Sequence, residues 1–77
     1  MTTVKINLNN TNKIKDFVNA ARSFESDINV RNERTLIDGK SVLGLFDLDL
    51  SRNVYADLIS DDENEIFRFK TVMEEFF

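Results

Sequence analysis

The stretch DGKSVLGL, residues 38–45, decides where this chain turns from strand into helix. Its Asp-Gly pair breaks the short apolar run that precedes it, because these residue types favour turns. Ser41 follows, and a serine at such a place accepts a hydrogen bond from the first turn of a helix. We therefore expect a short helix from Val42 to about Asp47, with a glycine inside it that lowers its helix propensity.

Upstream of this stretch, the chain switches between strand and helix patterns. Apolar and polar residues alternate over residues 4–8, which predicts a half-buried strand. The polar cluster at residues 9–12 offers N-cap residue types, and apolar residues then recur at helical spacing from about Thr11 to Ser23. Short alternating runs at residues 28–31 and 35–37 predict two strands that pair as a hairpin, although the turn between them has no glycine.

Downstream, a fourth strand is predicted over residues 54–58, where apolar residues alternate with Tyr55 and Asp57. Ser60 and Glu63 have the spacing of a capping box, with Ser60 as the N-cap residue. A last helix runs from there to near Phe77. Its inner stripe consists of Ile66, Phe69, Met73 and Phe76.

The order of these elements is β-α-β-β-α-β-α, and the chain of 77 residues is long enough for one domain, residues 1–77. Such an order packs as one sheet with helices on one face. We therefore expect an α+β fold, an open-faced β-sandwich with a four-stranded, mainly antiparallel sheet and three helices on one face.

The charge and the missing residue types exclude several classes of function. The net charge is −4 without a long basic patch, so we expect neither nucleic acid nor a membrane surface as a partner. The chain has no cysteine and no histidine, so we expect no disulfide, no thiol nucleophile, no metal site and no cofactor. It has neither a signal-peptide pattern nor an apolar run of transmembrane length, which favours the cytoplasm.

Residues 38–45, read together with the element order, resemble HPr, the small phosphocarrier of the bacterial sugar phosphotransferase system. The family shows a Lys-Ser-(Ile/Val)-(Met/Leu)-Gly pattern there. Residues 20–30 look like the family's exit from its first helix and its second strand, and residues 61–63 open the last helix in a similar way. The resemblance covers nearly the whole chain and implies the HPr fold.

The resemblance ends at the family's phosphorylation site. The family carries its phosphoryl group on a histidine just before the first helix, in a His-Ala-Arg-Pro type motif. Counting back from Phe24 places Asn10 near the histidine position, Asn12 near the arginine position and Lys13 at the proline position, in a shortened loop. An amide nitrogen is no nucleophile, and losing the arginine removes a phosphate clamp. We therefore expect no catalytic residue, and a degenerate active-site loop at Asn10 and Asn12.

Two other features are candidate sites. The resemblance implies that Ser41 is a target of an ATP-dependent HPr-type serine kinase. It also implies a protein-binding patch at Val42, Leu43 and Phe46, of which we expect at least two to be exposed. Asp16 lies where the family's docking face is apolar or neutral, and an acidic residue there disfavours the family's acidic partners.

The sequence thus predicts a regulatory or protein-binding module related to the phosphotransferase system, and not an enzyme. A protein is the expected partner, either an HPr-type serine kinase or a transcriptional regulator. Two alternatives stay open: a phosphocarrier with a non-histidine acceptor such as an aspartate, and a structural subunit of a larger assembly. Phe67 and Phe77 fall outside the core pattern and offer a surface for homo-oligomers.

Overall fold

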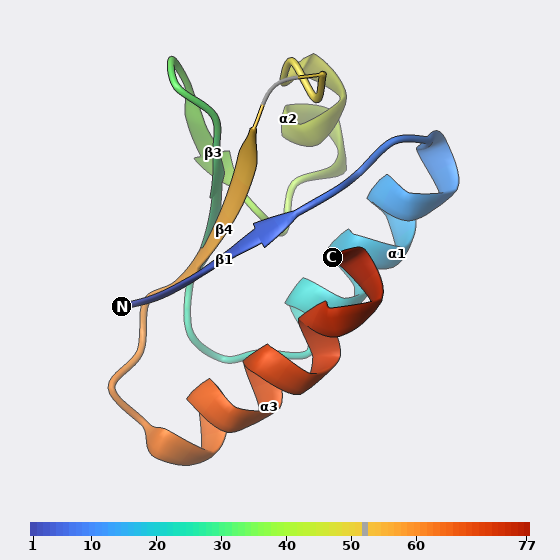
Figure 1. Cartoon of the computed structure of the whole chain (residues 1–77). Helices are drawn as coiled ribbons and strands as arrows, with labels where there is room; N and C mark the ends of the chain where they lie inside the picture. The colour runs from blue at the N-terminus through green and yellow to red at the C-terminus, as the bar shows by residue number, and fades with distance from the viewer. Residues whose placement is uncertain (52) are drawn as a thin grey trace.

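Four strands form one sheet in the order β1-β4-β2-β3, and all three neighbouring pairs are antiparallel (Figure 1). The chain was analysed as a computed structural model, which describes residues 1–51 and 53–77. The strands are β1 (Thr2–Ile6), β2 (Ile28–Arg31), β3 (Leu36–Asp38) and β4 (Val54–Leu58). Because β4 lies between β1 and β2, these two outer neighbours are parallel to each other, and the helix that connects them crosses over β4.

Three helices cover one face of this sheet and leave the other face open (Figure 1). They are α1 (Thr11–Arg22), α2 (Val42–Asp47) and α3 (Glu63–Met73), and a short 3-10 turn, η1 (Glu74–Phe76), follows α3. This arrangement confirms the predicted order and the predicted open-faced fold. Among the described residues, no helix is both long enough and apolar enough to cross a lipid bilayer.

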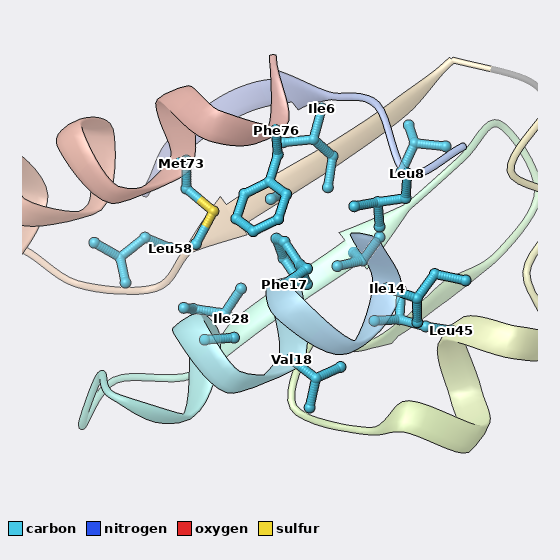
Figure 2. Packing of buried hydrophobic residues seen from close by; sticks show 14 of the residues in the cluster. Ile6, Leu8, Ile14, Phe17, Val18, Ile28, Leu45, Leu58, Met73 and Phe76 are labelled. Carbon is cyan, nitrogen blue, oxygen red and sulfur yellow. The ribbon is translucent and has the colours of Figure 1, made fainter. Parts of the chain in front are cut away.

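The core lies between the sheet and the helices, where the apolar stripes of all these elements meet. Phe17 of α1 packs edge-on against Phe76 of η1, with ring centroids 5.4 Å apart, and Figure 2 shows the two rings pointing toward each other. Phe24 and Phe69 form a second edge-on pair at 5.8 Å. Of the predicted inner stripe of the last helix, Ile66 is only partly buried. The other core residues include Ile14, Val18, Ile28, Val30, Leu45, Leu58 and Met73.

The turn between β2 and β3 is made by an asparagine side chain instead of a glycine. Asn32 Oδ1 accepts hydrogen bonds from the backbone N–H groups of Arg34 and Thr35, both at 2.9 Å. A short polar side chain that bonds to its own backbone can hold a turn in this way. The third strand begins one residue later than predicted, at Leu36.

The predicted capping box at the start of the last helix is wrong. Asp62 is the N-cap residue, and its carboxylate accepts hydrogen bonds from the N–H groups of Asn64 at 2.8 Å and Glu65 at 3.2 Å. Ser60 lies two residues earlier, and its hydroxyl accepts from the N–H of Asp62. Both serine and aspartate are good caps, so the sequence pattern alone placed the helix start two residues too early.

Glu65 fastens the start of α3 to the loop after α1. Its carboxylate accepts a hydrogen bond from the Ser26 hydroxyl, and further bonds from the Ser60 hydroxyl and from the backbone of Ser26 and Glu25. These bonds, first of all the one from the Ser26 hydroxyl, hold the pKa of Glu65 below the ordinary value for a glutamate. The folded state therefore binds a proton at the Glu65 carboxylate more weakly than the unfolded state does.

We expect this link to make the fold sensitive to acid. The stabilisation by the Glu65 carboxylate is fully present above the ordinary glutamate pKa and is lost as the pH falls through the lowered pKa. The midpoint temperature of thermal unfolding should therefore decrease when the pH is lowered below about 4. Glu65→Gln should show a smaller fall than the wild type in melts followed by circular dichroism. Glu63→Gln removes an exposed carboxylate from the same turn and is the control. Parallel pH curves for Glu65→Gln and wild type would contradict the expectation.

Gly39 lies at a position in residues 38–45 where the fold leaves no room for a side chain. Its backbone N–H donates to the carbonyl oxygen of Ile28 at 2.7 Å, and the glycine is buried. A Cβ atom added to Gly39 would lie 2.9 Å from that same oxygen and 2.9 Å from Cγ2 of Ile28. The chain can pass this close to β2 only without a side chain.

Gly39→Ala is therefore expected to lower the free energy of unfolding by roughly 1–3 kcal/mol, the usual cost of forcing extra volume into a packed site. Urea denaturation measures this cost. Gly44→Ala is a useful comparison, because its Cβ would lie no closer than 3.2 Å to a neighbour, the Ser41 hydroxyl oxygen. If Gly39→Ala proved the milder of the two changes, the close approach to Ile28 would not be the reason for the glycine.

Candidate functional site

Ser41 begins α2 as its N-cap residue. Its hydroxyl oxygen accepts a hydrogen bond from the N–H of Gly44 at 3.0 Å, and its carbonyl accepts one from Leu45 at 3.1 Å. The hydroxyl group is therefore used as a cap, while the residue as a whole stays partly exposed. Leu45 and Leu48 are buried and fasten this short helix to the core.

Two of the three residues in the predicted patch are exposed. Leu43 is 79% exposed and Phe46 is 46% exposed, and we call this pair the α2 patch. Val42 differs, because it is partly buried and packs against the core. A helix of six residues needs one face for packing, and Val42 lies on that face together with Leu45. The α2 patch therefore consists of one largely exposed and one partly exposed apolar side chain.

The loop that was predicted to be a degenerate active-site loop lies at the start of α1. Asn10 is the N-cap residue, and its Oδ1 accepts a hydrogen bond from the N–H of Lys13 at 2.9 Å while its Nδ2 donates to Asn9 Oδ1. Asn12 is exposed in the first turn. The Lys13 ammonium group is turned away from this loop, since it donates to the carbonyl of Glu75 at 2.9 Å.

A hollow of about 410 Å³ lies between this loop and the end of α2. We call it the Asn10 hollow. Its described lining is apolar at Leu8, Ile14, Phe46 and Leu50, with uncharged polar side chains at residues 9–11 and at Ser51. Because Phe46 belongs to both, the hollow and the α2 patch form one continuous surface. The structure thus places Phe46, one of the three residues predicted for docking, beside the loop that begins α1.

One group of polar residues was missed by the sequence reasoning. Asp57 is only 2% exposed although it lies on the open face of the sheet. It accepts hydrogen bonds from the Thr3 hydroxyl at 2.6 Å and from Arg31 Nε at 2.8 Å. Asp57 in turn raises the pKa of the Arg31 guanidinium, mainly through this hydrogen bond. The Arg31 side chain also lies over the ring of Tyr55, at 5.0 Å from its centroid.

Within the described ranges, no three acidic, histidine or cysteine side chains gather closely enough to hold a metal ion. Asp57 is satisfied by its partners, and no buried side-chain nitrogen or oxygen in this part of the chain lacks a hydrogen bond. The described residues around Ser41 and Asn10 thus present apolar side chains, uncharged amides and hydroxyl groups.

Comparisons with known proteins give the family and the fold. A family model described as "PTS HPr component phosphorylation site" matches residues 9–74, a range that includes Asn10, Ser41 and the α2 patch. Among solved structures, the chain is similar to HPr-C-His from Thermoanaerobacter tengcongensis, with 25% sequence identity and a TM-score of 0.73. That alignment covers 97% of this chain and 93% of the other. A search among curated proteins gave no match.

Proposed function

Because this chain belongs to the HPr family of phosphotransferase-system components, we propose that it works in the cytoplasm as a regulatory or protein-binding module without phosphohistidine chemistry. Members of the family are phosphocarriers rather than catalysts. The observation that carries the proposal is the coexistence of two features on one surface. An uncharged asparagine caps α1 at the family's phosphorylation loop, and the α2 patch beside it stays exposed.

The loss of chemistry follows from the side chain of Asn10. An imidazole nitrogen is a nucleophile near neutral pH, whereas an amide nitrogen has no comparable lone pair to offer to a phosphorus atom. The oxygen of the same amide is committed to the N–H of Lys13. Asn12 offers no positive charge to a phosphoryl group, and the Lys13 ammonium group is bound to the C-terminal turn. This loop therefore offers neither a nucleophile that could accept a phosphoryl group nor a cation that could hold one.

The function that this proposal assigns to the surface is docking of a partner protein. Exposed apolar side chains beside a hollow are a common centre of protein–protein contacts, where a few large residues supply most of the binding energy. Leu43 and Phe46 have this character, and the neighbouring Asn10 hollow extends the apolar area. A protein partner, such as a serine kinase of the HPr type or a transcriptional regulator, fits this surface best.

Ser41 gives this surface a means of control. A phosphoryl group adds about 1.5–2 negative charges and strong acceptor oxygens. On Ser41 it would stand two residues from Leu43 and would replace the neutral hydroxyl that caps α2. A partner that binds the α2 patch would then meet a changed charge at the edge of its contact.

Two experiments test the proposal. Incubation with the phosphoenolpyruvate-dependent enzyme I and labelled donor should leave the chain unlabelled, and a stable label on any residue would defeat the claim that phosphotransfer is lost. Capture from an extract of the native host should then be compared for wild type and Ser41→Asp. A protein whose recovery differs between the two baits supports regulated docking. Identical sets of captured proteins would argue against control through Ser41.

A further inference from the structure

Three cationic side chains bond to the backbone around the C-terminal end of α1, one from α1, one from the turn before α2 and one from α3. Lys40 Nζ donates to the carbonyl of Phe24 at 2.7 Å, and Arg22 Nε donates to the carbonyl of Lys40 at 3.3 Å. Arg68, from α3, donates through its two terminal nitrogens to the carbonyl of Ser23 at 2.8 Å and to its hydroxyl at 3.0 Å. We call Arg22, Lys40 and Arg68 the cation cluster.

The members of the cation cluster are held in place before any ligand arrives. The guanidinium of Arg68 lies over the ring of Phe24, with its central carbon 3.7 Å from the ring centroid. Lys40 is partly buried and its ammonium group is fastened to the backbone. Such fixed cations bind an anion with less loss of side-chain entropy than free surface lysines do.

The cluster carries more positive charge than its structural role requires. The carbonyl groups at the end of a helix amount to only about half a negative charge, which the three cations exceed, and the Asp38 carboxylate bonds to the backbone N–H of Lys40 rather than to its ammonium group. No member of the cluster has a carboxylate within 4 Å, since the one ion pair among the described residues joins Arg31 to Asp57. The nearby Glu25 is exposed and does not pair with the cluster.

Each member also keeps N–H groups that the backbone does not use. Lys40 uses one of its three N–H groups, and Arg22 donates only through Nε, so both of its terminal nitrogens remain free. From this geometry we propose that the cation cluster is a binding site for a phosphate monoester or free phosphate. A dianion with several acceptor oxygens suits a group of neighbouring cations better than a single carboxylate does.

This site is separate from the degenerate loop. Asn10 caps the N-terminal end of α1, whereas the cation cluster surrounds the opposite end of the same twelve-residue helix. At a rise of about 1.5 Å per residue, the two places are about 18 Å apart. The proposal rests on Arg22, Lys40 and Arg68 and not on Leu43 or Phe46, so this site and the α2 patch can each fail without the other.

The test is an amide NMR titration of the whole chain at constant ionic strength with two probes, inorganic phosphate and N-acetyl-phosphoserine amide. We expect saturable shifts at residues 22–25, 40–41 and 68. Tighter binding of phosphoserine would identify a phosphorylated side chain as the source of the ligand, and tighter binding of phosphate would identify the free anion. Shifts that do not saturate, that scatter over all cations, or that sodium chloride reproduces would overturn the site.

Variants separate this binding from the structural role of the cations. Arg22→Gln should weaken the binding of the better probe at least fivefold, and it leaves both carbonyl caps from Lys40 and Arg68 in place. Lys70→Gln removes one exposed charge from α3 outside the cluster and should change the affinity less than twofold. Equal effects of the two variants would mean that the anion senses only the net charge of the protein.

Discussion

Asp57→Ala is expected to lower the free energy of unfolding by about 3 kcal/mol, one of the largest effects of any polar substitution in this chain. Asp57 is the sole buried acidic residue among those described, and it joins three strands. It accepts from Thr3 on β1 and from Arg31 on β2 while lying on β4 between them. A hydrogen bond to a charged group contributes about 1.5–3 kcal/mol, and the alanine removes all of these bonds together.

The measurement is urea denaturation of the variant at neutral pH, with Asp16→Ala as the control. Asp16 is exposed on α1, so its removal should change the free energy of unfolding by no more than about 0.5 kcal/mol. Arg31→Met should cost less than Asp57→Ala, because the Arg31 side chain is 36% exposed and water already surrounds part of it. If Asp57→Ala lowered the free energy of unfolding as little as Asp16→Ala, the hydrogen-bond network of Asp57 would not stabilise the fold.

The sequence predicted the elements because their residue patterns are local. The spacing of Phe17 and Val18 with Ile14 and Ala21 is enough to place α1, and both flanking strands alternate clearly. Ser41 was correctly expected to cap α2, since the cap depends only on the next three residues. The family resemblance agreed with the element order along the chain and implied the open-faced fold, while the order β1-β4-β2-β3 within the sheet was not predicted.

The parts that the sequence did not predict depend on contacts between distant segments. Thr3 and Asp57 are 54 residues apart, and the burial of Asp57 appears only when β4 is paired with both neighbours. The register offers a signal in retrospect, because Thr3, Asp57 and Asn29 lie side by side across three strands. An acid in a strand whose neighbours supply a hydroxyl and an arginine is a candidate for such a network.

At the candidate site, the burial of Val42 also depends on contacts between distant segments. Its sequence neighbours Leu43 and Phe46 are exposed, and only the direction in which α2 rests on the core decides which apolar side chain is covered. The hollow beside Asn10 likewise arises between residues 8–11 and Phe46, which are more than thirty positions apart. The family resemblance therefore suggested which residues to consider for docking, while their exposure and the shape of the surface depend on packing.

Leu43→Ser is expected to weaken binding to the partner captured by the wild-type chain at least thirtyfold. Leu43 is 79% exposed and forms the α2 patch together with Phe46. Large apolar residues at the centre of an interface commonly cost about 2 kcal/mol or more when truncated, and this corresponds to about a thirtyfold change in Kd. Because the side chain makes little contact in the free protein, the free energy of unfolding should stay within about 0.5 kcal/mol of wild type.

The matched control is Leu36→Ser, the same substitution at another exposed leucine. Leu36 is 60% exposed and begins β3, outside the α2 patch. Calorimetric titration of the partner should give Kd values within threefold of wild type for Leu36→Ser. Two results would reject the α2 patch as the docking surface: an unchanged Kd for Leu43→Ser, or an equal loss of affinity for both variants. The paired design thereby separates contact at α2 from a general loss of surface hydrophobicity.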